Sequence, residues 1–490
     1  MPIDIPPFGA RTVLWGVAQL HVFFGAFVLG APIFIVISEY LGLRKGDKRY
    51  ERLAHEMMKA VGIAYAFTAV FGVMFAFMLM GPFGTSTSYL MERFFPLFAT
   101  YGVLILVESS VMYAYWYSWD RMREPRLKRW HIWLGVLLNV VGTVLMLVMN
   151  AVASFMLTPP DSPETAGLWR LIRNDSWSGL NLHRFIGNLT FGGFMVALFA
   201  AFLFLTSRND EDRAYYDWMG FIGNFIGTAT LLIIPIAGYI YAKELFNYDA
   251  SISTLLMADK LSWFFEVQGV LVALLFLGAN YYMWLSIQRI EGGIRFARYM
   301  KTAFTVMFVG AAIWITPQAF LPDLTTPPSA GQSITDLAIP GNLAFLGLMM
   351  AKALAVTSIV ILTFVTYLVY RRALKTGNIV WGKIDVRAQY TLIFLPAVAV
   401  YTMGLMGAIR ELARGGDFVF RVVADPSPYW FTPTLAYTSV VTGVVTLIFF
   451  VLMAGIFWLG FKLQPAHVES EPAPVDLEEH VPDLVDERVR

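Results

Sequence analysis

The sequence contains no cysteine in 490 residues. Without thiols, the chain cannot form disulfides, bind an iron–sulfur cluster through thiolates or attach a c-type haem covalently. Any iron that it binds must therefore use histidine, methionine or carboxylate ligands. Charge is also scarce, because 14% of the residues are charged and 57% are hydrophobic, and the net charge of +1 gives no argument for nucleic-acid binding. A chain this apolar is expected to be a polytopic membrane protein.

Apolar runs of about 20 residues, the length that spans a bilayer, recur along the chain. They predict an all-α transmembrane bundle of eleven helices that forms one domain over residues 1–463. Because the first twelve residues contain only Arg11 as a basic residue and no small-residue cleavage site follows, the first run is expected to be a retained helix. The predicted spans are 13–41, 60–82, 95–118, 131–156, 181–206, 216–242, 263–287, 301–318, 341–370, 389–412 and 434–461.

Basic residues concentrate in alternate loops. The loops after the odd-numbered spans contain 21 lysines and arginines, whereas those after the even-numbered spans contain 7. Because cytoplasmic loops are the basic ones, we expect the N-terminus outside and the C-terminus inside a bacterial or archaeal cell membrane. Residues 464–490 contain eight acidic residues and four prolines, and are expected to form a disordered cytoplasmic tail.

Five side chains that can bind iron or carry a proton lie within the apolar runs. They are His21, Glu108, His183, Met350 and Glu411. An ionisable group at membrane depth costs at least about 2.5 kcal/mol, so it is a functional candidate by default. The predicted topology places four of them in the outer half of the membrane, with Glu108 nearer the middle.

Each candidate also has a simpler interpretation. Either histidine could make an interhelical hydrogen bond, and Met350 could be one of 23 packing methionines, with Met349 as a competing ligand. Glu411 could pair with a neighbouring arginine.

A glycine spacing favours a flat ligand beside the two histidines. Gly25 follows His21 by four residues, and Gly187 follows His183 by the same interval. Residues four apart share a helix face, and a missing Cβ lets a planar group approach the backbone.

Four cations lie next to the candidate ligands in the sequence: Arg184, Lys352, Arg410 and Arg414. Each could neutralise a carboxylate of a bound group such as a haem propionate, for which arginine is especially suited. Snorkelling to the interface is the simpler interpretation for Arg184 and Arg414. The remaining histidines are predicted on the cytoplasmic side or in the tail and are not assigned a haem: His55, His131, His467 and His480.

One run of sequence carries a family resemblance. Leu106-Val107-Glu108-Ser109-Ser110, followed by Trp119-Asp120-Arg121, resembles a helix of subunit I of cytochrome bd quinol oxidases. The resemblance covers about residues 10–210 and 340–462. Its further matches are His21, Asn150, His183, Met350 opening a helix that ends Tyr370-Arg371-Arg372, and Glu411 with Arg414.

The resemblance implies roles for the five candidates. His183 and Met350 would be the axial ligands of a low-spin haem b, His21 would bind the oxygen-reducing haem, and Glu411 would bind a neighbouring high-spin haem b. Glu108 would carry protons beside that pair. The implied cofactors are low-spin and high-spin haem b, with haem d as an alternative, and the implied partner is a second bd-like membrane subunit.

The chain also departs from the family pattern. Thr100 replaces an acid two turns before Glu108, Leu348 replaces an arginine before the methionine, and Gly415-Gly416-Asp417 replaces Gln-Pro-Trp. The long external loop that forms the quinol site is replaced by about 20 residues, 243–262, and two additional helices.

Three functions follow as hypotheses. The first is a bd-like terminal oxidase subunit that passes electrons from a low-spin haem b to a high-spin pair that reduces dioxygen. The second is a non-oxidase electron-transfer subunit of a larger complex, exchanging electrons between quinone and an external cytochrome c. The third is a proton-coupled transporter using Glu108 and Glu411, which the absence of an inverted repeat in the sequence disfavours.

Overall fold

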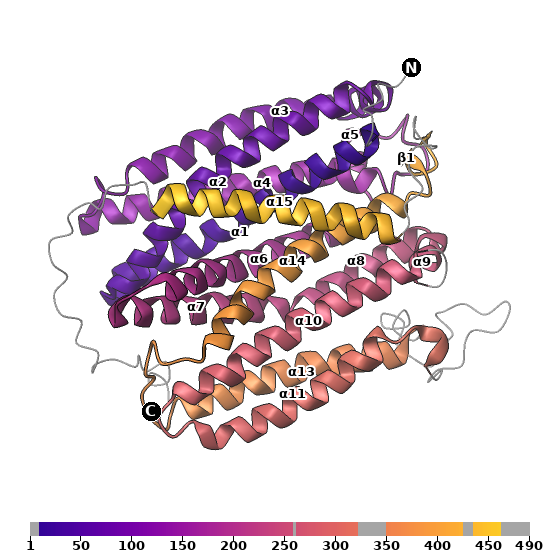
Figure 1. Cartoon of the computed structure of the whole chain (residues 1–490). Coiled ribbons are helices and arrows are strands. Elements are labelled where there is room, and N and C mark those ends of the chain that lie inside the picture. The colour runs from indigo at the N-terminus through magenta and orange to yellow at the C-terminus, as the bar shows by residue number, and fades with distance from the viewer. Residues whose placement is uncertain (1–8, 258–260, 322–348, 425–434, 462–490) are drawn as a thin grey trace, which may run out of the picture.

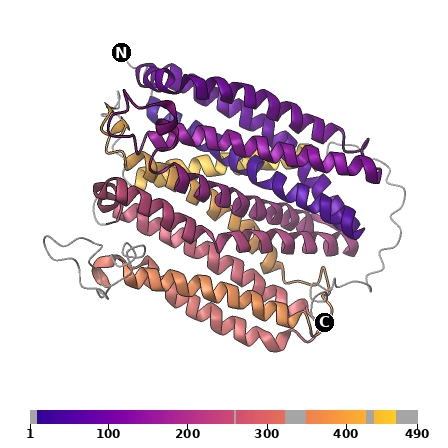
Figure 2. The same cartoon turned by 180° about the vertical axis from the view of Figure 1, so that it is seen from behind.

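The computed structural model describes residues 9–257, 261–321, 349–424 and 435–461. These residues form a bundle of long, roughly parallel helices (Figure 1). The start of α1 lies at the same end of the bundle as α5, α9 and β1, and Figure 2 shows the same arrangement from behind. The tail predicted over 464–490 and the first eight residues of the predicted span 341–370 lie outside the described residues.

The helices are α1 (Ala10–Lys45), α2 (Lys48–Met80), α3 (Gly84–Tyr117), α4 (Pro125–Phe155), α5 (Leu168–Ile172), α6 (Trp177–Thr206), α7 (Asp210–Leu231), α8 (Ile234–Tyr248), α9 (Ala250–Met257), α10 (Ser262–Ser286), α11 (Ile294–Ile315), α13 (Met350–Ala373), α14 (Val386–Leu412) and α15 (Leu435–Phe461). Two short 3-10 turns, η1 (Ile287–Arg289) and η2 (Gln318–Phe320), flank α11. Strands β1 (Asp417–Val419) and β2 (Val423–Ala424) form an antiparallel hairpin.

The predicted all-α membrane bundle is confirmed. Ten helical segments of the described chain are long and apolar enough to cross a membrane, and α7 and α8 together make one of them. α11 coincides with the remaining predicted span, although Arg295, Arg298 and Lys301 lie in its first eight residues.

The predicted helix 216–242 is interrupted. α7 ends at Leu231 and α8 begins at Ile234, with Pro235 in its first turn. The pyrrolidine ring lacks an N–H and clashes with the carbonyl four residues earlier, so the helix breaks at this point. The break makes α7 and α8 two separate helices. His183 faces the second of them, α8.

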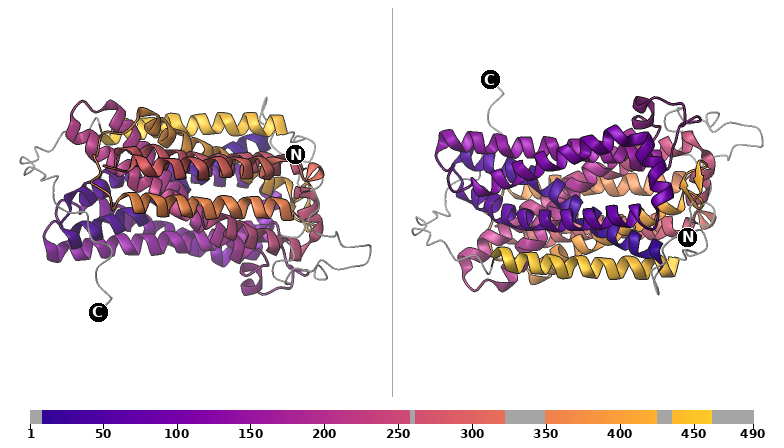
Figure 3. Two further views of the ribbon diagram at one scale, coloured as in Figure 1. Left: turned by 90° about the horizontal axis from the view of Figure 1, so that it is seen from below. Right: turned by 90° about the horizontal axis from the view of Figure 1, so that it is seen from above.

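Two groups of helices meet at α14. In the first group α1 packs against α2, α4 and α6, and α3 packs against α4. In the second group α10 packs against α14, and α11 packs against α13. Since α14 also packs against α6, it joins the two groups. Figure 3 shows the bundle from below and from above, with the long helices still roughly parallel.

α10 separates α14 from the α11–α13 pair (Figure 1). Phe264 of α10 clusters with Leu405 and Ile409 of α14. Glu266 pairs with Lys352 of α13. Since residues two apart on a helix point about 200° apart, these two positions face opposite sides of α10.

Candidate functional site

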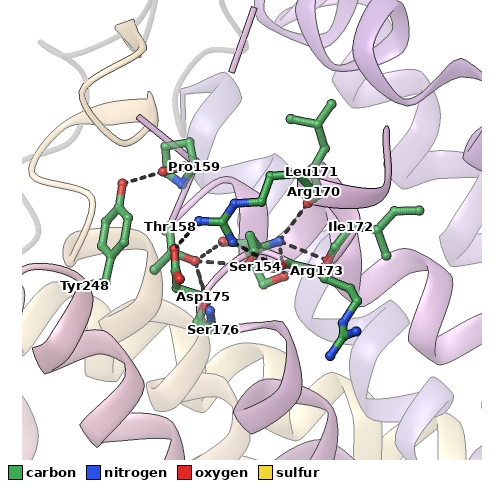
Figure 4. Close-up of polar contacts among 11 residues, drawn as sticks. Ser154, Thr158, Pro159, Arg170, Leu171, Ile172, Arg173, Asp175, Ser176 and Tyr248 are labelled. Atoms are coloured by element: carbon green, nitrogen blue, oxygen red, sulfur yellow. Dashed lines mark hydrogen bonds and ion pairs between the residues drawn. The ribbon is translucent and has the colours of Figure 1, made fainter. Parts of the chain in front are cut away.

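The start of α6, where two candidate residues lie, is held by a tightly bonded connection from α4. Figure 4 shows this connection: Thr158 Oγ1 lies 2.7 Å from Ser176 Oγ, and the Tyr248 hydroxyl donates to the Pro159 carbonyl at 2.7 Å. The Asn174 amide donates to Ser154 Oγ at 2.9 Å. These bonds fix the entry of α6 relative to α4 and α8. Sequence reasoning missed them, because hydroxyl and amide residues in a loop carry no partner information.

The His21 side chain is oriented by the backbone of α2. Its Nδ1 lies 3.0 Å from the Thr68 carbonyl oxygen. A carbonyl oxygen only accepts hydrogen bonds, so Nδ1 carries the proton and Nε2 keeps its lone pair. A Cβ on Gly72 would come within 3.0 Å of the ring, so only glycine leaves room for the imidazole there. His21 is therefore prepared to bind a metal through Nε2, with a second partner holding its tautomer.

Glu108 lies close to His21 along α2. The Tyr65 hydroxyl donates to Glu108 Oε2 at 3.0 Å and lies 2.9 Å from Ser109 Oγ. Tyr65 and Thr68 are three residues apart, on adjacent turns of one helix, so α2 brings the His21 and Glu108 contacts within about one turn of each other. On the opposite side, a Cβ on Gly142 would lie 2.8 Å from Glu108 Oε1. The carboxyl group can exchange a proton with Tyr65 through this bond.

His183 faces α8, just past the break at Pro235. A Cβ on Gly238 would lie 3.7 Å from the imidazole, and the ring of Tyr241 lies 6.3 Å away, centre to centre. The next residue, Arg184, donates to Asn150 Oδ1 at 2.5 Å. This contact holds the guanidinium against α4 within the bundle, so snorkelling to the interface does not describe Arg184.

Arginines gather around Glu411. Its carboxylate pairs with Arg414, and lies 3.9 Å from Arg410 and 4.0 Å from Arg11. The simpler interpretation of Glu411 as an arginine partner is thus what the structure shows. Arg11, which the sequence interpretation left without a role, joins α1 to the end of α14.

Two buried donors in this group lack an acceptor. Arg410 Nη1 and the Tyr241 hydroxyl are buried and make no hydrogen bond within the described part of the chain. Both groups lie close enough to the Arg184 guanidinium to interact with it electrostatically. Since a buried donor without an acceptor costs about 1–3 kcal/mol, an anionic group between α6, α8 and α14 would be stabilised there.

Space lies beside the candidate ligands. Within the described chain, a Cβ on Gly25 or on Gly187 would meet no atom within 4 Å. The same is true of Gly407, which precedes Glu411 by four residues and so lies one turn before it on the same helix face, a feature that the sequence interpretation did not notice. Open space one turn from each ligand, together with the unmatched donors, suits a flat macrocycle with carboxylate side chains.

Filling this space provides a test. We expect Gly25→Leu or Gly187→Leu to lose most of any bound macrocycle, because the leucine side chain occupies the space beside the imidazole. The helix itself should not suffer, since leucine is favoured over glycine by roughly 0.8 kcal/mol in helices. Pigment absorbance per milligram of purified protein measures the loss. Gly102→Leu, at an exposed glycine of α3 that also has nothing within 4 Å, is the matched control.

Met350 and Lys352 lie apart from the other candidates. Met350 is the first residue of α13, which packs on α11 and on the face of α10 opposite α14, so the structure does not bring it to His183. The pairing of His183 with Met350, or with Met349, across one macrocycle stays a prediction that this arrangement of helices does not favour. Lys352 pairs with Glu266 rather than joining the arginines near Glu411.

Comparison with known proteins agrees with this geometry. The model of the family cytochrome bd terminal oxidase subunit I matches residues 10–252. Over these residues, about half of the chain, the sequence is similar to cytochrome bd terminal oxidase subunit I. A solved structure described as that of bd oxidase from Geobacillus thermodenitrificans has the same fold, with a TM-score of 0.58 at 14% identity over 93% of this chain and 98% of that chain. No curated protein matches the sequence.

The family match does not extend evenly over the candidates. His21, Glu108 and His183 lie within the matched residues, whereas Met350 and Glu411 lie beyond residue 252. In the second half, the likeness to bd subunit I is therefore one of fold. This division coincides with the geometry, since the first three residues occupy the sites best arranged for ligand or proton binding.

Proposed function

We propose that this bd-like membrane subunit binds haem in the group formed by α1, α6, α8 and α14, and passes electrons from a low-spin haem b at His183 towards high-spin haem at His21. Terminal reduction of dioxygen at the His21 site is the function that the geometry supports best. The observation that carries the proposal is the His21 imidazole, whose Nδ1 is bound by the Thr68 carbonyl so that Nε2 is left for iron.

Haem in this fold supplies one-electron transfer, and a haem with a free coordination position also binds dioxygen. The chain's own residues perform the other tasks. Arg410 and Tyr241 would hold the haem carboxylates, because their buried donors have no acceptor within the described chain, and the neighbouring Arg184 would add positive charge. Glu108 would hold the proton needed beside His21, since Tyr65 keeps its carboxyl group in place. Glu411 would bind a haem only after giving up one of its arginine partners.

A second function is favoured by one observation. Glu411 is already held by Arg414, and the segment 243–262 that replaces the donor loop is short. A chain that kept the electron-entry haem but lost the high-spin pair would serve as a non-oxidase subunit of a larger complex, exchanging electrons between quinone and an external cytochrome c.

A second membrane subunit is the proposed partner. In the apolar windows of α2 and α3 only 11% of the residues are buried, against 72% in α6. Helices this exposed along their length present apolar surface either to lipid or to another subunit, and the bd-like fold makes a homologous subunit our choice.

Difference spectra of the purified protein test the proposal. We expect a reduced-minus-oxidised spectrum with a low-spin b-type signal that His183→Ala removes, because that variant lacks the ligand facing Gly238 and Tyr241. Met350→Leu is the matched control, and should keep the signal because α10 lies between α13 and α14. A colourless wild-type protein would refute haem binding altogether. Oxygen consumption with quinol, compared with reduced cytochrome c, then separates the oxidase from the electron-transfer subunit.

A further inference from the structure

A second ionisable cluster lies at the opposite end of α1 from the haem group. It joins Glu39 of α1, Tyr115 of α3, and Lys128 and His131 of α4. Glu39, Tyr115 and His131 have 0% of their surface exposed, and Lys128 has 3%. Sequence reasoning placed His131 at the cytoplasmic end of a helix and did not assign it a haem. Its burial follows from Gly135, one turn on, whose missing Cβ lets Tyr115 lie against α4.

The contacts of His131 determine how many protons the cluster holds. Nε2 lies 2.9 Å from the Tyr115 carbonyl oxygen, which can only accept, so Nε2 carries a proton. Nδ1 lies 2.5 Å from Glu39 Oε1, and two lone pairs would repel at that distance. A further proton must therefore lie between Nδ1 and the carboxylate. The Tyr115 hydroxyl donates to Glu39 Oε2 at 2.6 Å, which favours the ionised carboxylate and the doubly protonated ring.

The cluster has a route to water. Lys128 Nζ lies 3.0 Å from Glu39 Oε1 and also 3.0 Å from Glu51 of α2, whose side chain is 45% exposed. The other charged or titratable groups nearby are His55, which stacks on Trp119, and Lys59, Asp120 and Arg123. A proton arriving at Glu51 from solvent is thus two ionic contacts from Glu39.

The cluster also points along α3 towards Glu108. Tyr115 lies seven residues after Glu108, two turns or about 10.5 Å along the same face of the helix. Two glycines of α4 have the same seven-residue spacing. A Cβ on Gly135 would meet the Tyr115 ring, and a Cβ on Gly142 would meet Glu108. Asn139 lies one turn from each glycine, and its amide donates to the Gly135 carbonyl oxygen at 2.8 Å.

We propose that the Glu39–His131 pair is a proton-loading site that refills Glu108 through the seam between α3 and α4, with Asn139 as the intermediate polar group. In each turnover the Nδ1–H bond of His131 breaks and an O–H bond forms at Glu108. A solvent proton entering by way of Glu51 then restores the N–H bond, and no electrons move in these steps. The role rests on the proposed function, because Glu108 needs refilling only if a haem beside it is reduced.

The protonation of the pair is tested without any haem. Solid-state ¹⁵N NMR of protein labelled in the histidine rings should show one residue with both ring nitrogens protonated at neutral pH, and His131→Gln should remove that signal. Detection of a bare nitrogen on His131 would overturn the proposal. This measurement stands even if the purified protein is colourless, so the failure of haem binding and the failure of the pair are distinguishable.

The path is tested by proton uptake after rapid reduction, followed with a pH-indicating dye. We expect Glu39→Gln and Asn139→Leu to slow uptake at least tenfold while the haem is reduced at the wild-type rate. Asn224→Leu is the matched control, since Asn224 is a buried asparagine of α7 outside the seam. Asn139→Leu leaves the ionic cluster intact, so it decides the question if Glu39→Gln fails to fold. Wild-type uptake in Asn139→Leu, or equal slowing in Asn224→Leu, would show that the cluster only holds helices together.

Discussion

Alanine in place of His21 is expected to abolish most of the change that carbon monoxide makes in the reduced absorption spectrum. Carbon monoxide binds ferrous iron only where a coordination position is free, and His21 is the candidate whose single free nitrogen would leave the opposite position open. Its Nδ1 is bound to the Thr68 carbonyl, so Nε2 is the ring atom that would bind the iron, and alanine removes it. The expected effect is a near-complete loss, measured as the difference between spectra with and without carbon monoxide.

Two outcomes would contradict this assignment. The first is a His21→Ala protein that keeps the full response, which would place the open site at another residue. The second is a wild-type spectrum that does not respond to carbon monoxide, which would mean six-coordinate haem throughout and favour the electron-transfer subunit. His55→Ala is the control, because His55 stacks on Trp119 at the other end of the bundle.

Glu108→Gln is expected to keep the haem but reduce turnover by about 10²-fold or more, the usual contribution of a positioned proton-transfer group. Glutamine has nearly the shape of glutamate and still accepts the Tyr65 hydrogen bond, but it cannot gain or lose a proton. Thr100, two turns earlier, cannot replace it, because its hydroxyl donates to the Pro96 carbonyl of its own helix at 2.8 Å. Turnover is measured as oxygen consumption per haem, and the pH dependence of the high-spin haem potential should weaken in parallel.

Glu92→Gln provides the comparison for this experiment. Glu92 is an exposed carboxylate on the same helix, and its replacement should leave turnover unchanged. A Glu108→Gln protein with wild-type turnover and an unaltered pH slope would show that Glu108 only packs and hydrogen-bonds. Tyr65→Phe should give a smaller loss, since it removes one donor to the carboxyl group but leaves the titrating group.

The candidate residues differ in whether they could be recognised from their own helix alone or only from distant partners. His21, Glu108 and His183 are recognisable because an ionisable group is costly within an apolar run, a property of one helix at a time. Their partners were not recognisable, since Thr68 acts through a backbone carbonyl and Tyr241 follows a break at Pro235 that the apolar pattern conceals. Glu411 was correctly placed near arginines, but the contribution of Arg11 comes from the far end of the chain.

The sequence by itself determined the all-α membrane bundle, because twenty-residue apolar runs have no stable alternative to spanning helices in lipid. It did not determine which helix lies beside which. Eleven apolar helices present similar surfaces, and only the family resemblance implied that the helix of Met350 lies near His183. In the structure α10 lies between α13 and α14, since Phe264 clusters with Leu405 and Glu266 pairs with Lys352. The Glu39–His131 pair is likewise a product of tertiary structure, because a proton shared between residues 92 positions apart depends on packing that no local pattern records.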